Sequence, residues 1–480
     1  MRRTKIVATL GPATEAPETV EALLRAGVDV VRLNFSHGNP DEHKRRARLV
    51  REAAKKLGTT VAILGDLQGP KIRTERFVGG GVQLASGDSF ILDMDLDQDA
   101  GNQERVGVTY KTLSKEIASG DILLLDDGRI ILEVIRVDGP EIHTRVVNGG
   151  YLSNNKGINR RGGGLSAGAL TDKDKVDIKL AAELDVDYLA VSFPRSAADI
   201  EEARSLLNEA GGSAGIVAKI ERAEAIEAID EIIDASDVIM IARGDLGVEI
   251  GDAELPAIQK DLIHRARVKD TIAITATQMM ESMIENPIPT RAEVFDVANA
   301  VLDGTDAVML SGETAVGKYP NKVVKAMNDI CLAAEQQRSV LKSDHRINTR
   351  FERVDEAIAM ASMYTANHTG AKAIAALTES GATTLWMSRI SSGIPIYAMS
   401  GVEKTRQRVK LYRGVYPVDF PIKATSHAQA NLKAVEILQQ YNVVEDGDLV
   451  IITKGDLMGS SGGTNAMKIV EVGNMIEPVN

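Results

Sequence analysis

The chain alternates short apolar runs with longer stretches of helical periodicity, and this alternation limits its possible folds more than any other feature. Alternating strands and helices form parallel sheets, and eight largely apolar strands can close into a (β/α)8 TIM barrel. The expected strands are Ile6–Leu10, Val28–Leu33, Val61–Leu64, Tyr188–Phe193, Ile216–Ile220, Val238–Ala242, Ile272–Ala276 and Ala307–Leu310. The expected helices are Glu18–Ala26, Asp41–Leu57, Ala197–Glu209, Ala223–Ile233, Ala257–Arg267, Arg291–Leu302 and Asn321–Glu335.

One connection between the expected strands is far longer than the others. About a hundred residues follow the third strand, and Gly-Asp turns such as Ser86-Gly87-Asp88 separate alternating runs within them. This pattern predicts a small antiparallel β domain, a β-barrel inserted in a loop of the larger barrel. Its position on the catalytic side indicates a lid. The larger barrel resumes near Thr171, where Thr171-Asp172-Lys173-Asp174 is typical of a helix start.

A third pattern begins after about residue 345 and predicts a C-terminal α/β layer domain. Its turn Thr378–Thr383 offers hydroxyls and free backbone N–H groups, as phosphate sites do. A second loop, residues 454–464, is also rich in glycine and hydroxyls, but such turns are common without a ligand. The predicted boundaries are 1–70 and 169–345 for the catalytic barrel, 71–168 for the lid and 346–480 for the C-terminal domain.

Charge and cysteine content exclude several classes of protein. The 56 basic and 68 acidic residues give a net charge of −12, which argues against a nucleic acid or an anionic membrane as partner. The single cysteine, Cys331, excludes an intramolecular disulfide framework and fits a reducing cytosol. No signal peptide is expected, because Thr9, Gly11 and Pro12 interrupt the first apolar run. No membrane span is expected either, because no segment approaches the roughly 18 continuous apolar residues that a span needs. We therefore expect a cytoplasmic protein.

Charged residues at the ends of the expected strands indicate a functional site. Lys219 and Glu221 lie two residues apart and so point to the same face, and Arg243 and Asp245 follow the next strand. Such residues are rarely buried unless they are paired or bound to a metal. The turn at Gly244 could present backbone N–H groups to a carboxylate. Further polar residues at strand ends are Arg32, Asn34, Ser36, His37, Asp66, Lys71, Arg73, Thr277 and Ser311.

These residue types favour a metal-assisted reaction of an anionic substrate. Glu221 and Asp245 are hard oxygen ligands that suit Mg²⁺ or Mn²⁺, and the sequence has no His or Cys cluster for zinc. Lys219 could neutralise charge that develops on a phosphoryl group or an enolate. Arg32 and Arg73 are suited to binding phosphate. The alternative is a purely structural role, in which Lys219 and Glu221 form an ion pair that supports the rim.

Six motifs resemble those of the pyruvate kinase family, in the same order along the whole chain. They are Val31–Gly38, Asp66–Arg73, Lys219–Arg222, Ala242–Gly247, Thr277–Met283 and Leu310–Ala315. Leu67, Gln68, Lys71 and the stretch 154–159 resemble most closely the bacterial isoform that fructose 1,6-bisphosphate does not control. No Gly-x-x-x-x-Gly-Lys-Ser/Thr pattern is present, and the family has none.

The resemblance implies transfer of a phosphoryl group from phosphoenolpyruvate to ADP, giving ATP and pyruvate. It implies Mg²⁺ at Glu221 and Asp245 and a catalytic set of Lys219, Arg32, Arg73, Thr277 and Ser311. Positions that match substrate contacts are Arg32, Lys219, Gly244, Asp245 and Thr277. Positions that match nucleotide contacts are Asn34, Ser36, His37, Arg73 and, from the lid side, Lys173. Thr277 and Ser311 lie where the family is thought to relay a proton to the enolate through water.

The resemblance also implies a homotetramer under allosteric control. The effector loop would use Thr378, Ser380, Gly381 and Thr383. Because Glu379 adds a negative charge there and residues 454–463 contain no tryptophan, a sugar monophosphate such as glucose 6-phosphate or ribose 5-phosphate is the expected activator.

Residues matching a monovalent-cation pocket are present, but we expect that K⁺ is not required. The pocket residues are Asn34, Ser36 and Asp66. Lys71 replaces a glutamate of many family members, and its ammonium could supply the positive charge that K⁺ otherwise brings. The alternative is that Lys71 points to solvent and K⁺ still binds.

Two other functions compete with this interpretation. A pyruvate-enolate aldolase would share the metal-binding Glu221 and Asp245, but it would need neither the lid nor Arg73. A catalytically inactive sensor would bind sugar phosphates through the C-terminal domain alone. It predicts loss of the residues at the strand ends, yet those positions are filled.

Overall fold

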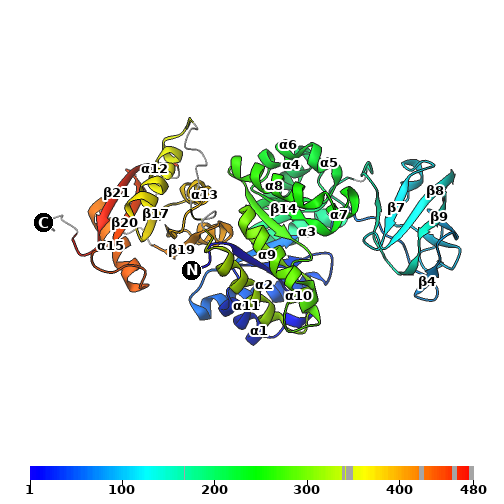
Figure 1. Ribbon diagram of the computed structural model, residues 1–480, viewed down its shortest axis with the longest axis horizontal. Coiled ribbons are helices and arrows are strands. Elements are labelled where there is room, and N and C mark those ends of the chain that lie inside the picture. The colour runs from blue at the N-terminus through cyan, green and yellow to red at the C-terminus, as the bar shows by residue number, and fades with distance from the viewer. Residues whose placement is uncertain (167, 338–340, 342–349, 421–425, 457–461, 475–480) are drawn as a thin grey trace.

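Eight parallel strands close the central barrel of the computed structural model (Figure 1), as the alternation predicts. The structure describes residues 1–480 except 167, 338–340, 342–349, 421–425, 457–461 and 475–480. Around the barrel the order is β1-β16-β15-β14-β13-β12-β3-β2. The strands are β1 (Lys5–Thr9), β2 (Val30–Asn34), β3 (Ala62–Asp66), β12 (Tyr188–Val191), β13 (Gly215–Ile220), β14 (Val238–Ala242), β15 (Ile272–Ala276) and β16 (Ala307–Leu310).

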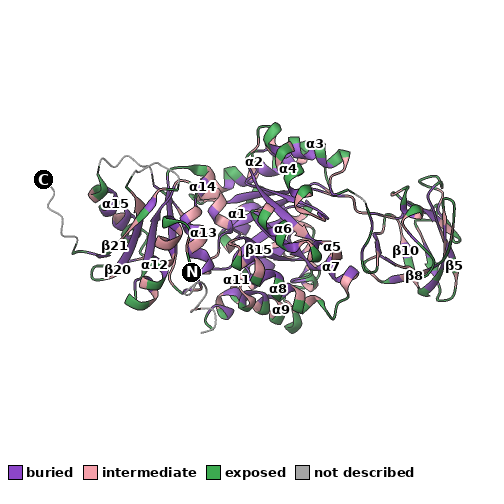
Figure 2. Cartoon of the chain, turned by 90° about the horizontal axis from the view of Figure 1, so that it is seen from above, coloured by how far each residue is buried: buried purple, intermediate pink, exposed green. Residues whose placement is uncertain are grey.

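Helices cover the outside of the barrel (Figure 2) and strand side chains fill its inside, so that every residue of β1, β3, β14 and β15 is buried. The expected helix 223–233 is two helices instead, which meet at Ala228. The helices are α1 (Pro17–Ala26), α2 (Pro40–Leu57), α3 (Asp172–Glu183), α4 (Ala197–Glu209), α5 (Ala223–Glu227), α6 (Ile229–Ala235), α7 (Arg243–Ile250), α8 (Leu255–Val268), α9 (Arg291–Asp303), α10 (Gly312–Ala315) and α11 (Pro320–Ala334). None of the helices in the described ranges is both long and apolar enough to cross a membrane.

The inserted domain projects from one end of the barrel (Figure 1) and has a hydrophobic core of its own. A six-stranded sheet of order β11-β7-β8-β9-β5-β6 and a two-stranded sheet, β10-β4, enclose that core. The prediction of antiparallel pairing holds except for β5 and β6, which pair in parallel. The strands are β4 (Gly81–Leu84), β5 (Ser89–Asp93), β6 (Arg105–Gly107), β7 (Ile122–Leu125), β8 (Ile130–Asp138), β9 (Glu141–Asn148), β10 (Gly150–Ser153) and β11 (Ile158–Arg160).

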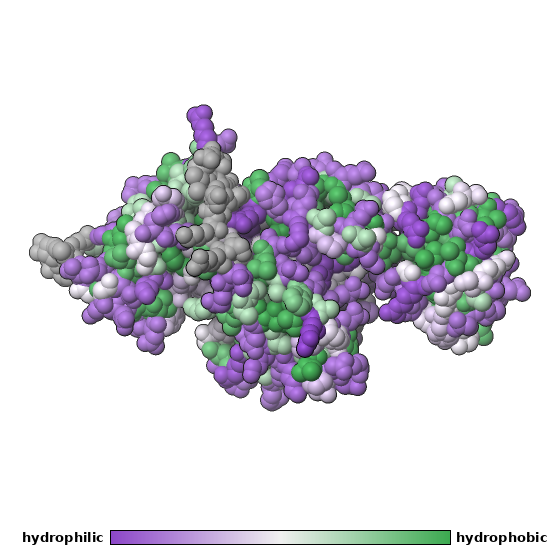
Figure 3. Space-filling view, viewed as in Figure 1, coloured by the Kyte–Doolittle hydropathy of each residue, from purple (hydrophilic) through white to green (hydrophobic). Residues whose placement is uncertain are grey.

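The C-terminal domain is a five-stranded sheet with helices packed against it, at the opposite end of the barrel from the lid. Its order is β19-β18-β17-β20-β21, and only β21 runs antiparallel to its neighbour. Helix α14 is not among the elements expected from the sequence. The predicted boundary between the barrel and this domain, at residues 345 and 346, lies outside the described residues. The elements are α12 (Val354–Thr369), β17 (Ala373–Leu377), α13 (Ala382–Arg389), β18 (Ile396–Ser400), α14 (Glu403–Arg408), β19 (Val415–Asp419), α15 (His427–Gln440), β20 (Leu449–Gly455) and β21 (Thr464–Glu471). The face shown in Figure 3 is mostly hydrophilic over the barrel helices.

Candidate active site

Four charged side chains form one chain of contacts at the carboxyl ends of the barrel strands. Arg32 Nε donates a hydrogen bond to Asp66 Oδ2 over 2.6 Å. Lys219 Nζ lies 3.3 Å from Asp66 Oδ1 and 3.0 Å from Glu221 Oε1. Asp66 is 0% exposed, Glu221 2% and Arg32 9%. Buried charges require opposite charges beside them, so these four residues depend on one another.

The same contacts shift the pKa values of the two carboxyl groups in opposite directions. Burial alone would raise the pKa of Asp66, but Lys219 and Arg32 lower it below its usual value. Burial raises the pKa of Glu221, and repulsion by Asp245 and Asp66 adds to this although Lys219 opposes it. The pKa of Lys219 is raised, because the attraction of Asp66 and Glu221 exceeds the effect of burial. At neutral pH the site therefore holds a permanent ammonium between carboxylates.

Asp245 lies in the first turn of α7, so the expected turn at Gly244 is the start of a helix instead. The Gly244 N–H is not free, because it donates to Thr277 Oγ1 over 2.8 Å. Thr277 has a positive φ of 67°, which is uncommon for a β-branched residue. Arg243, the first residue of α7, fixes the start of that helix by donating to both carboxylate oxygens of Asp296, over 2.6 and 2.8 Å. Thr277 thus meets the start of α7 at Gly244, the residue before Asp245.

Lys71, at the start of the predicted lid, does not point to solvent but contacts Asp245. Its Nζ lies 2.6 Å from Asp245 Oδ1, over a sequence separation of 174 residues. Glu221 and Asp245 are close enough for each to feel the other's charge, since Asp245 raises the Glu221 pKa. Carboxylate oxygens such as those of Glu221 and Asp245 are the ligands that a hard divalent cation prefers. The described residues contain no group of three or more His, Cys, Asp or Glu side chains that could hold a metal, so substrate or water oxygens would complete the coordination.

The residues that match nucleotide contacts gather around His37. Burial lowers the His37 pKa, and the charges of Arg73, Arg32 and Lys173 lower it further. Lys173 belongs to barrel helix α3 and not to the lid, because Thr171 caps that helix as predicted. Its Nζ donates to the Phe35 carbonyl over 2.7 Å.

Two further predicted nucleotide residues, Asn34 and Ser36, form a local turn. Arg73, near the start of the lid, contacts another residue of the lid. Asn34 Oδ1 accepts a hydrogen bond from the Ser36 N–H over 3.1 Å. Arg73 Nη1 donates to the Asn155 carbonyl over 3.0 Å.

The loop after β16 depends on Glu313, which the sequence analysis missed. Its carboxylate accepts hydrogen bonds from the Ser311 N–H over 2.6 Å and from the Met280 N–H over 3.1 Å. Burial raises the pKa of Glu313. Glu313 thus joins the loops that follow β15 and β16, and fixes the backbone at Ser311.

Ser192 is a second residue that the sequence analysis missed. Lys219 Nζ donates to Ser192 Oγ over 2.7 Å, and Ser192 Oγ donates to the Leu67 carbonyl over 2.8 Å. Ser192 directly follows β12, and the rule that function collects at strand ends would have found it.

The predicted effector loop meets the second loop of the C-terminal domain. Thr383 Oγ1 lies 2.9 Å from Thr464 Oγ1, although residues 457–461 of that second loop lie outside the described part of the chain. Two of the N–H groups expected to be free are engaged. The Gly381 N–H donates to Thr378 Oγ1 over 2.9 Å and the Ala382 N–H to Ser380 Oγ over 3.4 Å.

A closed (β/α)8 barrel with buried lysine, arginine and carboxylate groups at its strand ends defines a barrel enzyme for an anionic substrate. Comparisons with known proteins specify the class. Residues 1–324 match the family model "Pyruvate kinase, barrel domain", and residues 356–470 match "Pyruvate kinase, alpha/beta domain". The chain belongs to the pyruvate kinase family and is a phosphotransferase.

Several curated relatives are similar over nearly the whole chain. "Pyruvate kinase II" of Salmonella typhimurium is 58% identical over 476 residues, which cover 98% of this chain and 99% of the relative. The pyruvate kinase of Haemophilus influenzae is 57% identical over 459 residues, 95% of this chain and 96% of the relative. That of Geobacillus stearothermophilus is 43% identical over 481 residues, 99% of this chain but 81% of the relative.

Proposed function

We propose that the enzyme transfers the phosphoryl group of phosphoenolpyruvate to ADP, giving ATP and pyruvate, at the carboxyl rim of the barrel. The observation that carries this proposal is the buried chain Arg32, Asp66, Lys219 and Glu221. It holds two permanent cations where a doubly charged phosphate and an enolate would need them.

Arg32 and Lys219 have distinct roles in this reaction. The Arg32 guanidinium donates through Nε to Asp66 and through Nη1 to Thr9 Oγ1, which leaves its Nη2 for a phosphate oxygen. The Lys219 ammonium neutralises negative charge on the phosphoryl group as it leaves the enolate oxygen. Asp66 holds both cations in place, so neither has to reorganise during transfer.

Glu221 and Asp245 would hold Mg²⁺ or Mn²⁺. When bound there, the cation supplies positive charge that polarises the phosphate and enolate oxygens. Thr277, whose hydroxyl is fixed beside the Gly244 N–H, would position the pyruvate moiety together with the start of α7. Thr277 and Ser311 would deliver a proton through water to the enolate carbon, which completes pyruvate.

ADP would bind where the charges of Arg73, Arg32 and Lys173 converge on His37. Asn34 and Ser36 border this region, and the same two residues with Asp66 form the monovalent-cation pocket. We propose that K⁺ is not required. Lys71 already brings a fixed positive charge to the side of the site where Asp245 lies, 2.6 Å away.

Regulation would follow from the C-terminal domain. A sugar monophosphate is proposed to bind at Thr378, Ser380, Gly381 and Thr383, because the contact of Thr383 with Thr464 brings the two hydroxyl-rich loops together. A cytoplasmic homotetramer remains the proposed form of the enzyme.

An assay that follows pyruvate formation from phosphoenolpyruvate tests the proposal. Turnover should require ADP and a divalent cation together. Pyruvate formed at the same rate without ADP would contradict phosphoryl transfer to a nucleotide. Aldehyde-dependent consumption of pyruvate would favour the aldolase instead, and the absence of turnover with intact sugar-phosphate binding would favour the inactive sensor.

A further inference from the structure

Glu249 is a buried carboxylate that is not part of the proposed active site, and it joins three segments that are distant in the chain. It belongs to α7, four residues after Asp245, and is 8% exposed. Its Oε2 accepts a hydrogen bond from the Ala223 N–H over 2.9 Å, and its Oε1 accepts one from Asn159 Nδ2 over 3.4 Å. Its backbone carbonyl accepts from the Gly162 N–H over 3.1 Å. One residue thus links α7 with the start of α5 and with the end of the lid.

The contact with Ala223 fixes the segment that carries Glu221. Ala223 begins α5, and the N–H groups in the first turn of a helix need acceptors from outside that helix. Glu221 lies only two residues earlier, directly after the last residue of β13. The hydrogen bond at Ala223 therefore restrains the backbone on one side of Glu221, as the pairing of β13 does on the other side.

The Glu221 carboxylate is held as well. Its Oε1 lies 3.0 Å from the Lys219 ammonium, and its Oε2 accepts a hydrogen bond from the Phe193 N–H over 2.9 Å. Phe193 has a positive φ of 56°, which is uncommon for a residue other than glycine, so the surrounding structure must maintain it. Glu221 is therefore fixed both through its carboxylate and through its backbone.

The position of Glu249 in α7 relates it to the other proposed metal ligand. Residues four apart in an α-helix lie on the same face, so Glu249 and Asp245 project from one side of α7. Asp245 acts on the Glu221 carboxylate, because its charge raises the pKa of Glu221. Glu249 holds the backbone two residues beyond Glu221. One helix thus sets the separation of the two carboxylates that would hold the divalent cation.

Helices α5 and α7 also hold the end of the lid. Asn159 lies in β11 and is 8% exposed, and Gly162 follows that strand. Glu224, in the first turn of α5, accepts a hydrogen bond from the Gly164 N–H. The chain that returns from the lid to the barrel is therefore bound by the helix that follows Glu221 and by the helix that contains Asp245.

These contacts do not require one particular protonation state of Glu249. Burial raises the pKa of Glu249 to about 7 and repulsion by Glu224 adds to this, whereas the Ala223 N–H and the Arg222 guanidinium lower the pKa. Either form of the carboxyl group keeps an oxygen that can accept the hydrogen bond from Ala223. The link between α7 and α5 is therefore present on both sides of neutral pH.

We propose that Glu249 is a positioning residue, which sets Glu221 against Asp245 and couples the divalent-cation site to the lid. This inference rests on the proposed function, because it takes these two carboxylates as the metal ligands. A bound cation restrains the two ligand segments and therefore also the end of the lid. By linkage, a lid held in place favours binding of the cation to the same degree.

Binding of Mn²⁺ to the full-length protein, followed by electron paramagnetic resonance of the free ion, tests the positioning role without turnover. Glu249→Met keeps most of the side-chain volume but removes both acceptor oxygens. It should weaken Mn²⁺ binding by about tenfold or more, the scale for a group that orients a metal ligand. Glu249→Gln keeps an acceptor for the Ala223 N–H and should bind Mn²⁺ nearly as tightly as the unmodified protein.

Two results of this experiment would overturn the proposal. Unchanged affinity in Glu249→Met would show that Glu249 does not position the site. If Glu249→Gln weakened binding as much as Glu249→Met, the negative charge of Glu249 and not its hydrogen bond would be responsible.

Glu221→Gln separates failure of this inference from failure of the proposed metal site. It should lose most of the Mn²⁺ affinity of the unmodified protein. If the unmodified protein bound no Mn²⁺, or if Glu221→Gln bound it equally well, the proposed metal site would be wrong and this inference with it. If Glu221→Gln lost binding and Glu249→Met did not, only the role of Glu249 would be wrong.

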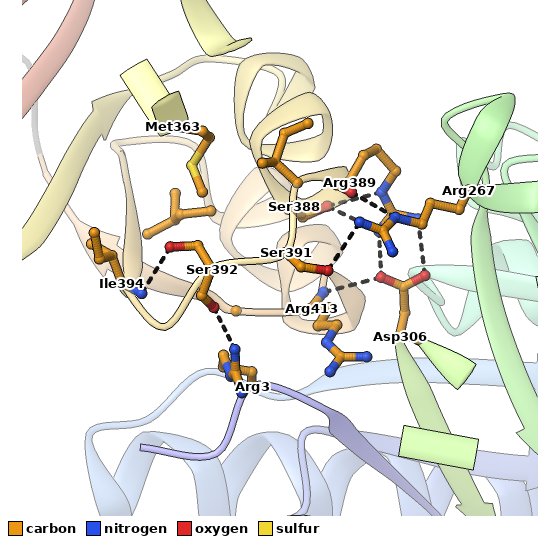
Figure 4. A pocket seen from close by; sticks show the side chains of 14 residues that line it. Arg3, Arg267, Asp306, Met363, Ser388, Arg389, Ser391, Ser392, Ile394 and Arg413 are labelled. Carbon is orange, nitrogen blue, oxygen red and sulfur yellow. Dashed lines mark hydrogen bonds and ion pairs between the residues drawn. The ribbon is translucent and has the colours of Figure 1, made fainter. Parts of the chain in front are cut away.

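Ser391→Ala is the matched control at the opposite end of the barrel. Arg267 Nη2 donates to Ser391 Oγ over 2.9 Å, which joins the barrel to the C-terminal domain (Figure 4). Removing this hydrogen bond between domains should leave Mn²⁺ binding unchanged. A loss of affinity equal to that of Glu249→Met would mean that the effect is not specific to Glu249, and would contradict the proposal.

Hydrogen exchange of the unmodified protein tests the coupling to the lid, and it does not depend on whether any variant folds. Adding Mg²⁺ should slow exchange in residues 159–164 and 222–227, because the N–H groups of Gly162 and Ala223 both donate to Glu249. Exchange in α15 of the C-terminal domain should not change. Unchanged exchange in residues 159–164 at saturating Mg²⁺ would overturn the coupling of the metal site to the lid.

Discussion

Replacing Lys219 by methionine should separate the catalytic role of its ammonium from its structural role. The substitution keeps most of the side-chain volume but removes the charge that lies 3.3 Å from Asp66 and 3.0 Å from Glu221. Loss of one preorganised electrostatic partner lowers kcat by about 10²- to 10³-fold. We therefore expect the variant to fold and to bind Mg²⁺, but to turn over at least about a hundredfold more slowly.

The same change should cost stability in a way that depends on pH. Breaking a buried ion pair typically costs about 3–5 kcal/mol, because a charge is left buried without its partner. Glu221 can relieve part of this cost by taking up a proton, since burial and Asp245 already raise its pKa. When folding raises the pKa of a carboxyl group, the free energy of unfolding of the protein falls as the pH rises from the usual pKa of that group to its raised pKa. The deficit of Lys219→Met should thus be larger at about pH 8 than at about pH 5.5.

Steady-state kinetics with phosphoenolpyruvate and ADP, and urea unfolding at the two pH values, provide the measurements. Lys260→Met is the matched control, because Lys260 pairs with Asp303 at the exposed surface of the same barrel. It should leave kcat unchanged. Near-normal turnover of Lys219→Met would refute the assignment. A stability deficit that is equal at both pH values would refute the proton uptake by Glu221.

Four further predictions follow. Activity in Na⁺ or tetramethylammonium salts should match activity in K⁺, and Lys71→Glu should make the enzyme depend on K⁺; abolition of turnover without K⁺ in the unmodified protein would contradict this. Glucose 6-phosphate or ribose 5-phosphate should lower the KM for phosphoenolpyruvate and Thr383→Ala should weaken the effect, whereas activation by fructose 1,6-bisphosphate alone would argue against the loop assignment. Ser192→Ala should lower kcat about tenfold by freeing the Lys219 ammonium, and an unchanged kcat would remove Ser192 from the site. Burial lowers the pKa of Lys5 to about 7 in the folded protein, so between about pH 7 and the usual lysine pKa the unfolded chain binds more protons than the folded one. The free energy of unfolding should therefore rise with pH over this range, and Lys5→Met should flatten that rise in urea unfolding titrations.

Local pattern was sufficient to predict the eight strands of the barrel, but not the short helices α7 and α10. Runs such as Val238–Ala242 and Ile272–Ala276 coincide with β14 and β15, because a strand buried on both faces needs a continuous apolar run. The break between α5 and α6 at Ala228 was missed, since neither glycine nor proline marks it. The parallel pairing of β5 with β6 was also missed, because strand direction depends on the path of the chain between strands and not on alternation.

The sequence by itself determined which residues could serve the site, since polar side chains after apolar strands meet at one rim of a closed parallel barrel. Only the tertiary structure decided how they pair. Lys71 reaches Asp245 across 174 residues, and Lys219 reaches Ser192 across 27. These contacts depend on the register of the strands and on the angle at which the lid joins the barrel. Neither quantity is encoded in the periodicity of a single segment, because both arise from packing between segments that are distant in the chain.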